Sequence, residues 1–241
     1  MLELKNLTKT FYQKVDKVVV NNLSLKVKKG EVFGFLGLNG AGKTTTVKMI
    51  VGLLFPDKGS ITISKDDHLS LAAKQRIGYM PESPQFYQHL TVAEVLRFAG
   101  QLYDLELAQI DAKIPLLLQQ VGLAGQENLL ARQMSKGMHQ RLAFAVALIN
   151  DPELLILDEP LDGLDPLGRL DFKKLINSLK KQGKTVFFST HILSDVEEIC
   201  DQVAILDQGK IIRQGTPKEL IGRGKKSLEE VFVEMVSEVK K

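Results

Sequence analysis

The glycine-rich segment at residues 37–44, GLNGAGKT, constrains the fold of this chain more than any other feature. It follows an apolar run at residues 31–36 and precedes a stretch, from Lys43 to about Leu53, that we expect to be helical. A strand, a glycine-rich loop and a helix in this order are typical of a phosphate-binding loop. Its glycines allow the backbone amides to turn inward, toward phosphate oxygens at the positive end of the helix.

Each side chain in this loop has an expected role in binding a nucleoside triphosphate. Lys43 is expected to reach the β- and γ-phosphates, and the hydroxyl group of Thr44 to ligate Mg²⁺. The loop therefore predicts a nucleoside triphosphate and Mg²⁺ as the ligands, and the family resemblance described below implies that the nucleotide is ATP. The predicted nucleotide-binding residues here are Gly37, Leu38, Asn39, Gly40, Ala41, Gly42, Lys43, Thr44 and Thr45.

Two acidic residues follow an apolar run at residues 154–157 and are themselves followed by a proline. At the end of a strand beside a phosphate-binding loop, Asp158 is expected to hold the metal through a water molecule. Glu159 is expected to orient or deprotonate the attacking water. The next strand is expected at residues 185–189, and His191 follows its carboxyl end. Ligands bind at such strand ends in an open parallel sheet. We expect His191 to contact the γ-phosphate, although a capping role would suit an isolated histidine equally well.

Strands and helices alternate from residue 154 onward, which predicts parallel strands with helical crossovers. Residues 203–206 and 210–213 flank a hairpin-type turn at residues 207–209. The middle of the chain is expected to be helical. Thr91 and Glu94 form a capping box there, and a second helix is expected to begin near Asp111, with Pro115 tolerated only in its first turn. A helix is also expected at residues 170–181.

Composition excludes several classes of protein. The 241 residues are 44% hydrophobic and 25% charged, as in ordinary globular proteins, and the single cysteine excludes an intrachain disulfide. Residues 1–5 lack a signal-peptide pattern, and no apolar run approaches the roughly 20 residues that span a bilayer. A role at a membrane would therefore require another protein.

We interpret the net charge of +3 as a solvated surface and expect no nucleic-acid partner. His68, His89 and His139 show no metal-ligand spacing.

The segment MSKGMHQR at residues 134–141, placed before the acidic strand end, resembles the signature loop of the ATP-binding cassette (ABC) family. The resemblance covers nearly the whole chain. It implies that Phe11 stacks on adenine, with Tyr12 as a competitor, and that Glu82 occupies the Q-loop position. It also implies that Asp165 belongs to the D-loop and that His191 is the switch histidine. The implied signature-loop residues are Ser135, Lys136, Gly137 and Met138.

The resemblance also implies the fold and the domain organisation. The expected fold class is α/β, a P-loop NTPase core with a mainly parallel sheet, an N-terminal antiparallel β-subdomain and an inserted α-helical subdomain. Residues 1–241 would form a single ABC ATPase domain. Its expected parts are the nucleotide-binding core at about 1–80 and 151–220, the helical subdomain at about 81–150 and a C-terminal helix at about 221–241.

In function, the resemblance implies a head-to-tail homodimer in which Ser135 and Gly137 of one subunit contact the γ-phosphate held by the other. The chain would work at the cytoplasmic face of a membrane, as a peripheral subunit on a separate permease. Glu82, Lys136 and Met138 depart from the usual family pattern. These departures and the ending SLEEVF at residues 227–232 resemble the ABC-2-type and multidrug exporter branch.

The family's permease-docking surface corresponds to residues 81–107 of this chain. We expect Phe98 and Tyr103 to be core residues and Phe86 and Tyr87 to contact the permease, with Leu90 as a further candidate. A soluble ABC ATPase that acts on ribosomes or DNA is the alternative, but such relatives typically carry two cassettes or a long coiled-coil insertion. A metabolic kinase would need an acceptor site or a lid, and the signature loop argues against it.

Overall fold

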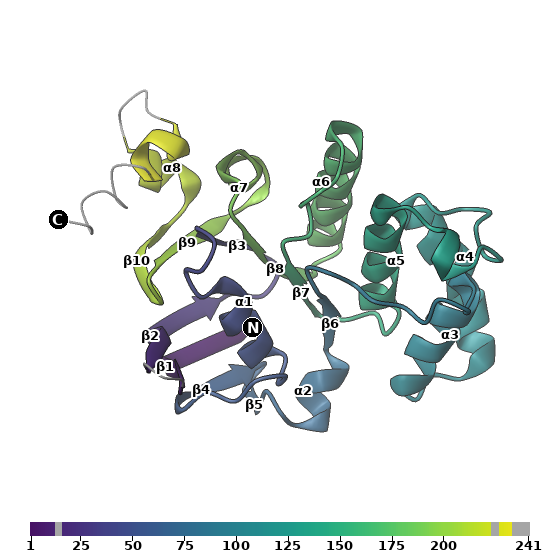
Figure 1. Cartoon of the computed structure of the whole chain (residues 1–241), viewed down its shortest axis with the longest axis horizontal. Coiled ribbons are helices and arrows are strands. Elements are labelled where there is room, and N and C mark those ends of the chain that lie inside the picture. Colours follow the sequence, from purple (N-terminus) through teal and green to yellow (C-terminus); the bar gives the residue numbers. More distant parts are fainter. Residues whose placement is uncertain (13–15, 223–226, 233–241) are drawn as a thin grey trace.

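The glycine-rich loop and the helix after it connect two sheets in the computed structural model, which describes residues 1–12, 16–222 and 227–232. Within these ranges the chain forms one six-stranded and one four-stranded sheet. The helix, α1 (Lys43–Ile50), ends three residues earlier than expected, because Gly52 turns the chain with a φ of 76°. Figure 1 shows α1 beside the four-stranded sheet and below the strands of the larger one.

The larger sheet carries the strand ends at which the sequence places the acidic residues. Its described strands lie in the order β10-β9-β3-β8-β7-β6, and all neighbours are parallel except β9 and β10, which form the expected hairpin. Buried apolar side chains run along β3, β7 and β8, as is usual for a sheet covered on both faces. The strands are β3 (Val32–Gly37), β6 (Ile77–Met80), β7 (Leu154–Asp158), β8 (Thr185–Thr190), β9 (Gln202–Asp207) and β10 (Lys210–Gly215).

The smaller sheet is antiparallel, with its described strands in the order β2-β1-β4-β5. It consists of β1 (Leu2–Phe11), β2 (Lys17–Val27), β4 (Lys58–Ile63) and β5 (Asp66–Asp67). Its apolar face packs on α1, where Val47, Met49 and Ile50 are buried in the same core cluster. A short helix, α2 (Leu71–Gln75), leads from this sheet to β6.

A helical layer is inserted between β6 and β7, and it lies at the opposite end of the molecule from the antiparallel sheet (Figure 1). It contains α3 (Val92–Leu102), α4 (Leu107–Val121), the 3₁₀ turn η1 (Ala131–Gln133) and α5 (Lys136–Leu148). The capping box is confirmed, since the Glu94 amide donates to Thr91 Oγ1 at 3.2 Å and the Thr91 amide donates to Glu94 Oε2 at 2.7 Å. The predicted α/β fold, with its antiparallel and helical subdomains, is thus confirmed.

The expected position of Pro115 in a first helical turn is wrong. The helix begins at Leu107, four residues before Asp111, so that Pro115 lies in its interior. An interior proline costs a helix about 3 kcal/mol. The apolar face of α4 offsets this cost, because each side chain that it buries contributes about 1.5–3 kcal/mol. The buried residues of this face are Ile110, Ile114, Leu117, Leu118 and Val121.

The aromatic residues of this layer are distributed differently from the prediction. Phe98 was expected in the core but is 46% exposed, because Val95, Leu96 and Ala99 form the buried face of α3. It meets the exposed Tyr87 edge to face, with ring centroids 5.9 Å apart. Phe86 is partly buried and stacks on His139. Tyr103 packs against the core, as expected.

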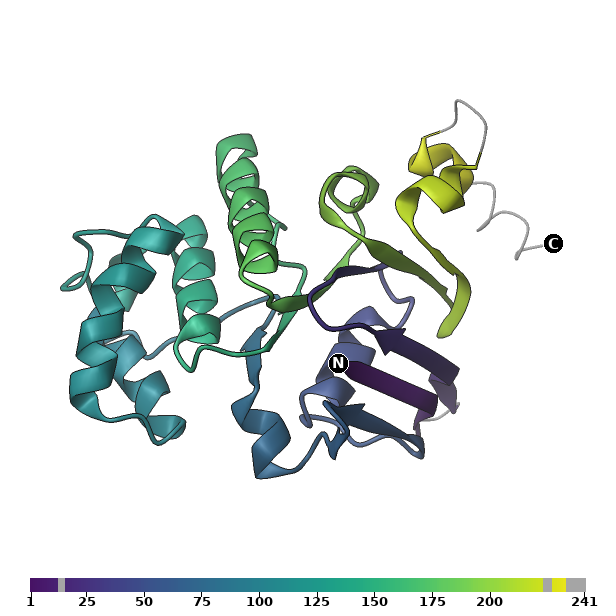
Figure 2. The same cartoon turned by 180° about the vertical axis from the view of Figure 1, so that it is seen from behind.

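Three further helices stand on the face of the large sheet opposite the antiparallel sheet (Figures 1 and 2). They are α6 (Pro166–Lys181), α7 (Leu193–Ile199) and α8 (Pro217–Ile221). The α6 helix begins four residues earlier than expected, because Asp165 caps it and Pro166 suits a first helical position. Near the C-terminus, Leu228, Val231 and Phe232 are buried. Residues 223–226 and 233–241 of the expected C-terminal helix lie outside the described residues.

No helix among the described residues is long and apolar enough to cross a membrane.

Candidate active site

The glycine-rich loop is held tightly against the strands around it. Gly42 adopts a φ of 109°, and a Cβ at this position would lie only 2.7 Å from the carbonyl oxygen of Val19. A Cβ on Gly37 would lie 2.7 Å from the carbonyl oxygen of Leu206. Side chains are therefore excluded at both positions, and the loop can bring its amides close to a ligand.

Lys43 lies at the first position of α1, with its ammonium group inside the loop. Its Nζ atom donates to the carbonyl oxygen of Gly37 at 2.7 Å and to that of Leu38 at 3.3 Å. The same atom is 3.1 Å from Oε1 of Glu159, and both side chains of this ion pair are buried. A buried ammonium group inside a glycine-rich loop, at the start of a helix, is well suited to bind phosphate oxygens.

The two acidic residues at the end of β7 are linked through Ser189, at the end of β8. The Ser189 hydroxyl group donates to Asp158 Oδ1 at 2.5 Å and accepts a hydrogen bond from the Glu159 amide at 3.0 Å. Asp158 and Ser189 are direct partners in the parallel pairing of these strands. The Thr44 hydroxyl group reaches the same Asp158 oxygen at 3.5 Å. Strand register therefore places Asp158 beside Ser189, and α1 brings Thr44, the other predicted metal residue, to the same carboxylate oxygen.

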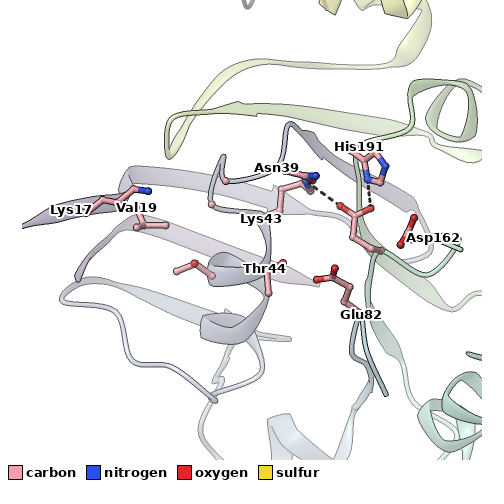
Figure 3. A pocket seen from close by; sticks show the side chains of 12 residues that line it. Lys17, Val19, Asn39, Lys43, Thr44, Glu82, Asp162 and His191 are labelled. Carbon is pink, nitrogen blue, oxygen red and sulfur yellow. Dashed lines mark hydrogen bonds and ion pairs between the residues drawn. The ribbon is translucent and has the colours of Figure 1, made fainter. Parts of the chain in front are cut away.

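Glu159 joins the loop lysine to the predicted switch histidine. Its Oε2 atom lies 3.0 Å from His191 Nδ1, while Oε1 faces Lys43 (Figure 3). Its backbone has a φ of 48°, an unusual value for a residue other than glycine. Backbone strain of this kind often accompanies functional residues. Glu159 contacts Lys43 and His191, whereas Asp158 contacts Ser189 and Thr44. Asp158 can thus hold a metal ion while Glu159 remains free for another role.

Acidic side chains dominate the electrostatics beside the loop. Burial raises the pKa of Asp158, and the nearby carboxylates of Glu82 and Glu159 raise it further, against the hydrogen bonds from Ser189 and Thr44. Burial together with Asp158 and Glu82 raises the pKa of Tyr79 to about 12. This excess of negative charge would be compensated by a divalent cation.

These residues surround an open cavity of about 530 Å³ (Figure 3), a size suited to a nucleotide. Nine predicted site residues line it: Asn39, Gly40, Gly42, Lys43, Thr44, Thr45, Glu82, Glu159 and His191. Gly37, Leu38 and Ala41 belong to the same loop, and Asp158 adjoins the cavity through Thr44.

The remaining predicted residues lie elsewhere and are not among those that line this cavity. Phe11 ends β1 with its ring at the surface, and Tyr12 is 75% exposed. Ser135 caps α5, and Asp165 caps α6 by accepting a hydrogen bond from the Gly168 amide at 2.6 Å. Lys136, Gly137 and Met138 form the first turn of α5. For the signature loop, the expected action on a second subunit stays a prediction.

Sequence reasoning missed four residues of the site. Lys17, Val19 and Asp162 line the cavity, and Ser189 connects the two acids. Asp162 stands three positions after Glu159, within the predicted D-loop, so its place next to the catalytic segment was a usable signal. Lys17 and Val19 come from the edge of the antiparallel sheet, and nothing in the local sequence identifies them.

The residues present fit Mg²⁺ bound together with a nucleotide. Among residues 1–12, 16–222 and 227–232, no cluster of three or more His, Cys, Asp or Glu side chains is arranged to hold a metal ion. A hydroxyl group and one buried carboxylate stand where phosphate oxygens and water can complete the coordination. Mg²⁺ is usually held in this way, with few protein ligands.

Comparison with known proteins agrees with this geometry. A family model described as "ABC transporter" matches residues 20–162. An uncharacterized ABC transporter ATP-binding protein from Nostoc is 45% identical, over 91% of this chain and 67% of its own length. The Nod factor export ATP-binding protein I from Cupriavidus pinatubonensis is 40% identical, over 92% of this chain and 68% of its own length. The chain spans between 59% and 73% of the length of such curated relatives.

Among solved structures, the chain is similar to a dimeric ATP-binding cassette, MJ0796, in a post-hydrolysis state bound to ADP and Pi. The sequence identity is 25% and the TM-score is 0.83, over 90% of this chain and 98% of the other.

Proposed function

Because the chain belongs to the ABC transporter family, we propose that it is the ATP-hydrolysing subunit of an exporter whose transport path is formed by a separate membrane protein. The chain is an ABC ATPase that binds ATP with Mg²⁺. The observation that carries the catalytic part of the proposal is the chain of contacts from Lys43 through Glu159 to His191, beside Asp158.

In our proposal Lys43 exchanges the Glu159 carboxylate for the β- and γ-phosphate oxygens of ATP. Glu159 is then held by His191 alone, at the edge of the cavity, and can accept a proton from the attacking water. A positioned general base contributes about 10²- to 10⁴-fold to a rate. Mg²⁺ bound by Thr44 and, through water, by Asp158 would offset the charge that develops on the phosphates. Glu82 adds a second carboxylate near this metal.

The second half of each site comes from a second copy of the chain. Ser135 caps α5, so the helix presents its free N-terminal amides next to this residue. Such amides bind anions, and the signature loop of one subunit would contact the γ-phosphate held by Lys43 of the other. ATP then holds the homodimer closed, and hydrolysis opens it. The dimeric cassette to which the chain is similar agrees with this arrangement.

The adenine ring is proposed to stack on Phe11, which ends β1 with its ring at the surface. We also propose that the whole of residues 1–241 acts as one ATPase domain. Its core would comprise about 1–80 and 151–220, and its helical part about 81–150.

An apolar groove supports docking of a separate permease. It has a volume of about 320 Å³ and lies where the end of α1, α2 and β6 meet the end of α3. Its rim includes Leu53, Leu71 and Leu102, whose side chains are all exposed. We propose that a cytoplasmic helix of the permease inserts its apolar face there, which places the chain at the cytoplasmic side of the membrane. The exposed pair Tyr87 and Phe98 extends the contact surface.

Steady-state ATP hydrolysis tests the catalytic part of the proposal. Glu159→Gln should lower kcat by at least about 100-fold while ATP binding survives. The matched control is Glu153→Gln, which changes an exposed glutamate at the edge of the same strand, paired with Lys29 at 3.1 Å. Full turnover by Glu159→Gln would remove this residue from the chemistry.

Sharing of the sites between subunits is tested by mixing two inactive variants. Ser135→Arg disrupts the signature loop, and Lys43→Ala removes the phosphate ligand. A mixed dimer keeps one intact composite site, so the mixture should exceed the activity of either variant alone. An activity no higher than that of the separate variants would contradict a shared site.

A further inference from the structure

A charged side chain is completely buried close to the candidate active site but takes no part in it. Asp195 lies in the first turn of α7 and has an exposed fraction of 0%. A buried carboxylate is costly unless it is paired. The charges around Asp195 therefore indicate what it does.

The partners of Asp195 lie on α6. Arg169 Nη2 is 2.7 Å from Asp195 Oδ2, and Lys173 Nζ is 3.0 Å from Oδ1. Lys173 also pairs with Glu198, on α7. Burial alone would lower the pKa of Lys173, but its hydrogen bonds to Glu198 and Asp195 raise it above the ordinary value, so that the ammonium group stays charged. The two helices are thus joined at a buried carboxylate by two cations one turn apart.

Each helix follows directly from a segment of the active site. Asp195 stands four residues after His191, and Ile192 between them is held by a hydrogen bond from its amide to Thr190 Oγ1 at 3.0 Å. Arg169 stands one turn after Asp165, and its amide donates to the Asp165 carbonyl at 2.9 Å. Residues 160–165 connect Glu159 to α6. The ion pairs therefore join the element that carries His191 to the element that anchors the segment after Glu159.

We propose that Asp195 is a positioning residue, whose ion pairs with Arg169 and Lys173 hold His191 against Glu159. This inference rests on the proposed function, in which the contact between His191 and Glu159 orients the general base. The contact spans 3.0 Å and depends on the relative placement of two segments that are 32 residues apart in sequence. Without the pairs, α7 would be fixed to α6 by apolar packing and by the contact of Lys173 with the exposed Glu198, which specify orientation less strictly than a buried carboxylate held by two cations does.

The direct test follows the histidine side chains by NMR in the isolated chain. The chain has four histidines, so the signals of His191 can be assigned with a His191→Gln variant. In the wild type, Glu159→Gln should shift the imidazole signals of His191. In an Asp195→Asn background, the His191 signals should move and should no longer respond to Glu159→Gln. Unchanged His191 signals in Asp195→Asn, with a full response to Glu159→Gln, would overturn the proposal.

Two further variants keep the test decisive. Arg169→Gln leaves Asp195 paired with Lys173, so it provides a folded variant if Asp195→Asn does not fold. In this background, too, the His191 signals should no longer respond to Glu159→Gln. Lys180→Gln is the matched control, because it removes an ion pair to Asp201 from the far end of α6. It should leave the His191 signals in place, and a shift equal to that of Arg169→Gln would indicate a general loosening of α6 instead.

Kinetics give a second readout. Arg169→Gln and Asp195→Asn should lower kcat by about 10- to 100-fold with little change in KM for ATP, because misplacement of a catalytic group affects the chemical step. A kcat equal to that of the wild type would contradict the proposal. Absence of ATP hydrolysis in the wild type would refute the proposed function, and the NMR result would still decide the role of Asp195.

Discussion

Replacing Ser189 by alanine removes the hydroxyl group that connects the two acids of the site. Two contacts are lost, the 2.5 Å hydrogen bond to Asp158 and the 3.0 Å bond from the Glu159 amide. Neither group has access to water that would replace its partner, since Asp158, Glu159 and Ser189 are all buried. The cost of this substitution therefore includes unsatisfied groups.

The size of the effect follows from the two contacts. A hydrogen bond to a charged group contributes about 1.5–3 kcal/mol, and an unsatisfied buried donor costs about 1–3 kcal/mol. We expect the free energy of unfolding to fall by at least about 2.5 kcal/mol. In a domain of this size, 1 kcal/mol corresponds to about 2–4 °C, so the melting temperature should fall by at least roughly 5 °C. Loss of a residue that orients a metal ligand should also weaken Mg²⁺ binding by about 10- to 100-fold.

Calorimetry of the nucleotide-free chain measures the first effect, and Mg²⁺ titration in the presence of a non-hydrolysable ATP analogue measures the second. Ser178→Ala is the matched control, because Ser178 is exposed on α6 and its hydroxyl group accepts only a 3.4 Å bond from Gln182. If Ser189→Ala melts within about 2 °C of the control and binds Mg²⁺ equally well, the proposed connection between the acids is wrong.

Three other substitutions test separate parts of the structure. The raised pKa of Asp158 means that the folded chain binds a proton more readily than the unfolded chain, so without Mg²⁺ stability should decrease as the pH rises above the ordinary pKa of an aspartate. Asp158→Asn should flatten this dependence in thermal melts at several pH values, and an unchanged slope would refute the assignment. Thr91→Ala should lower the free energy of unfolding by about 0.5–2 kcal/mol in denaturant titrations, because the capping box of α3 is lost, whereas no change would show that the cap contributes nothing. Glu82→Gln should lower the pKa of Tyr79, measured by ultraviolet titration, because one of its acidic neighbours is removed; an unaltered titration would place Glu82 outside this charge cluster.

The local features of the site could be read from the sequence. The phosphate-binding loop depends on glycines and a lysine within eight residues, and the capping box of α3 on residues three positions apart. The hairpin turn at residues 207–209 is similar, since Gln208 and Gly209 both adopt positive φ values, as this turn type requires.

Features that depend on register or on packing could not be predicted. The position of Ser189 opposite Asp158 is set by the pairing of β7 with β8, which no pattern in either strand specifies. Lys17 and Val19 reach the cavity from another sheet. The interior position of Pro115 depends on how much apolar surface α4 buries. Phe98 was misplaced because its aromatic character suggested burial, whereas the helical repeat of α3 directs it outward.

The central claim is that this ATPase works on a separate membrane protein, and one purification tests it most directly. The tagged Glu159→Gln chain would be isolated with Mg-ATP from gently solubilised cells, since blocked hydrolysis should keep the closed dimer on its partner. We expect a polytopic membrane protein to co-purify in stoichiometric amount, and to be lost when Leu53 and Leu102 in the apolar groove are replaced by glutamate. Recovery of ribosomes or DNA with no membrane protein would contradict the account.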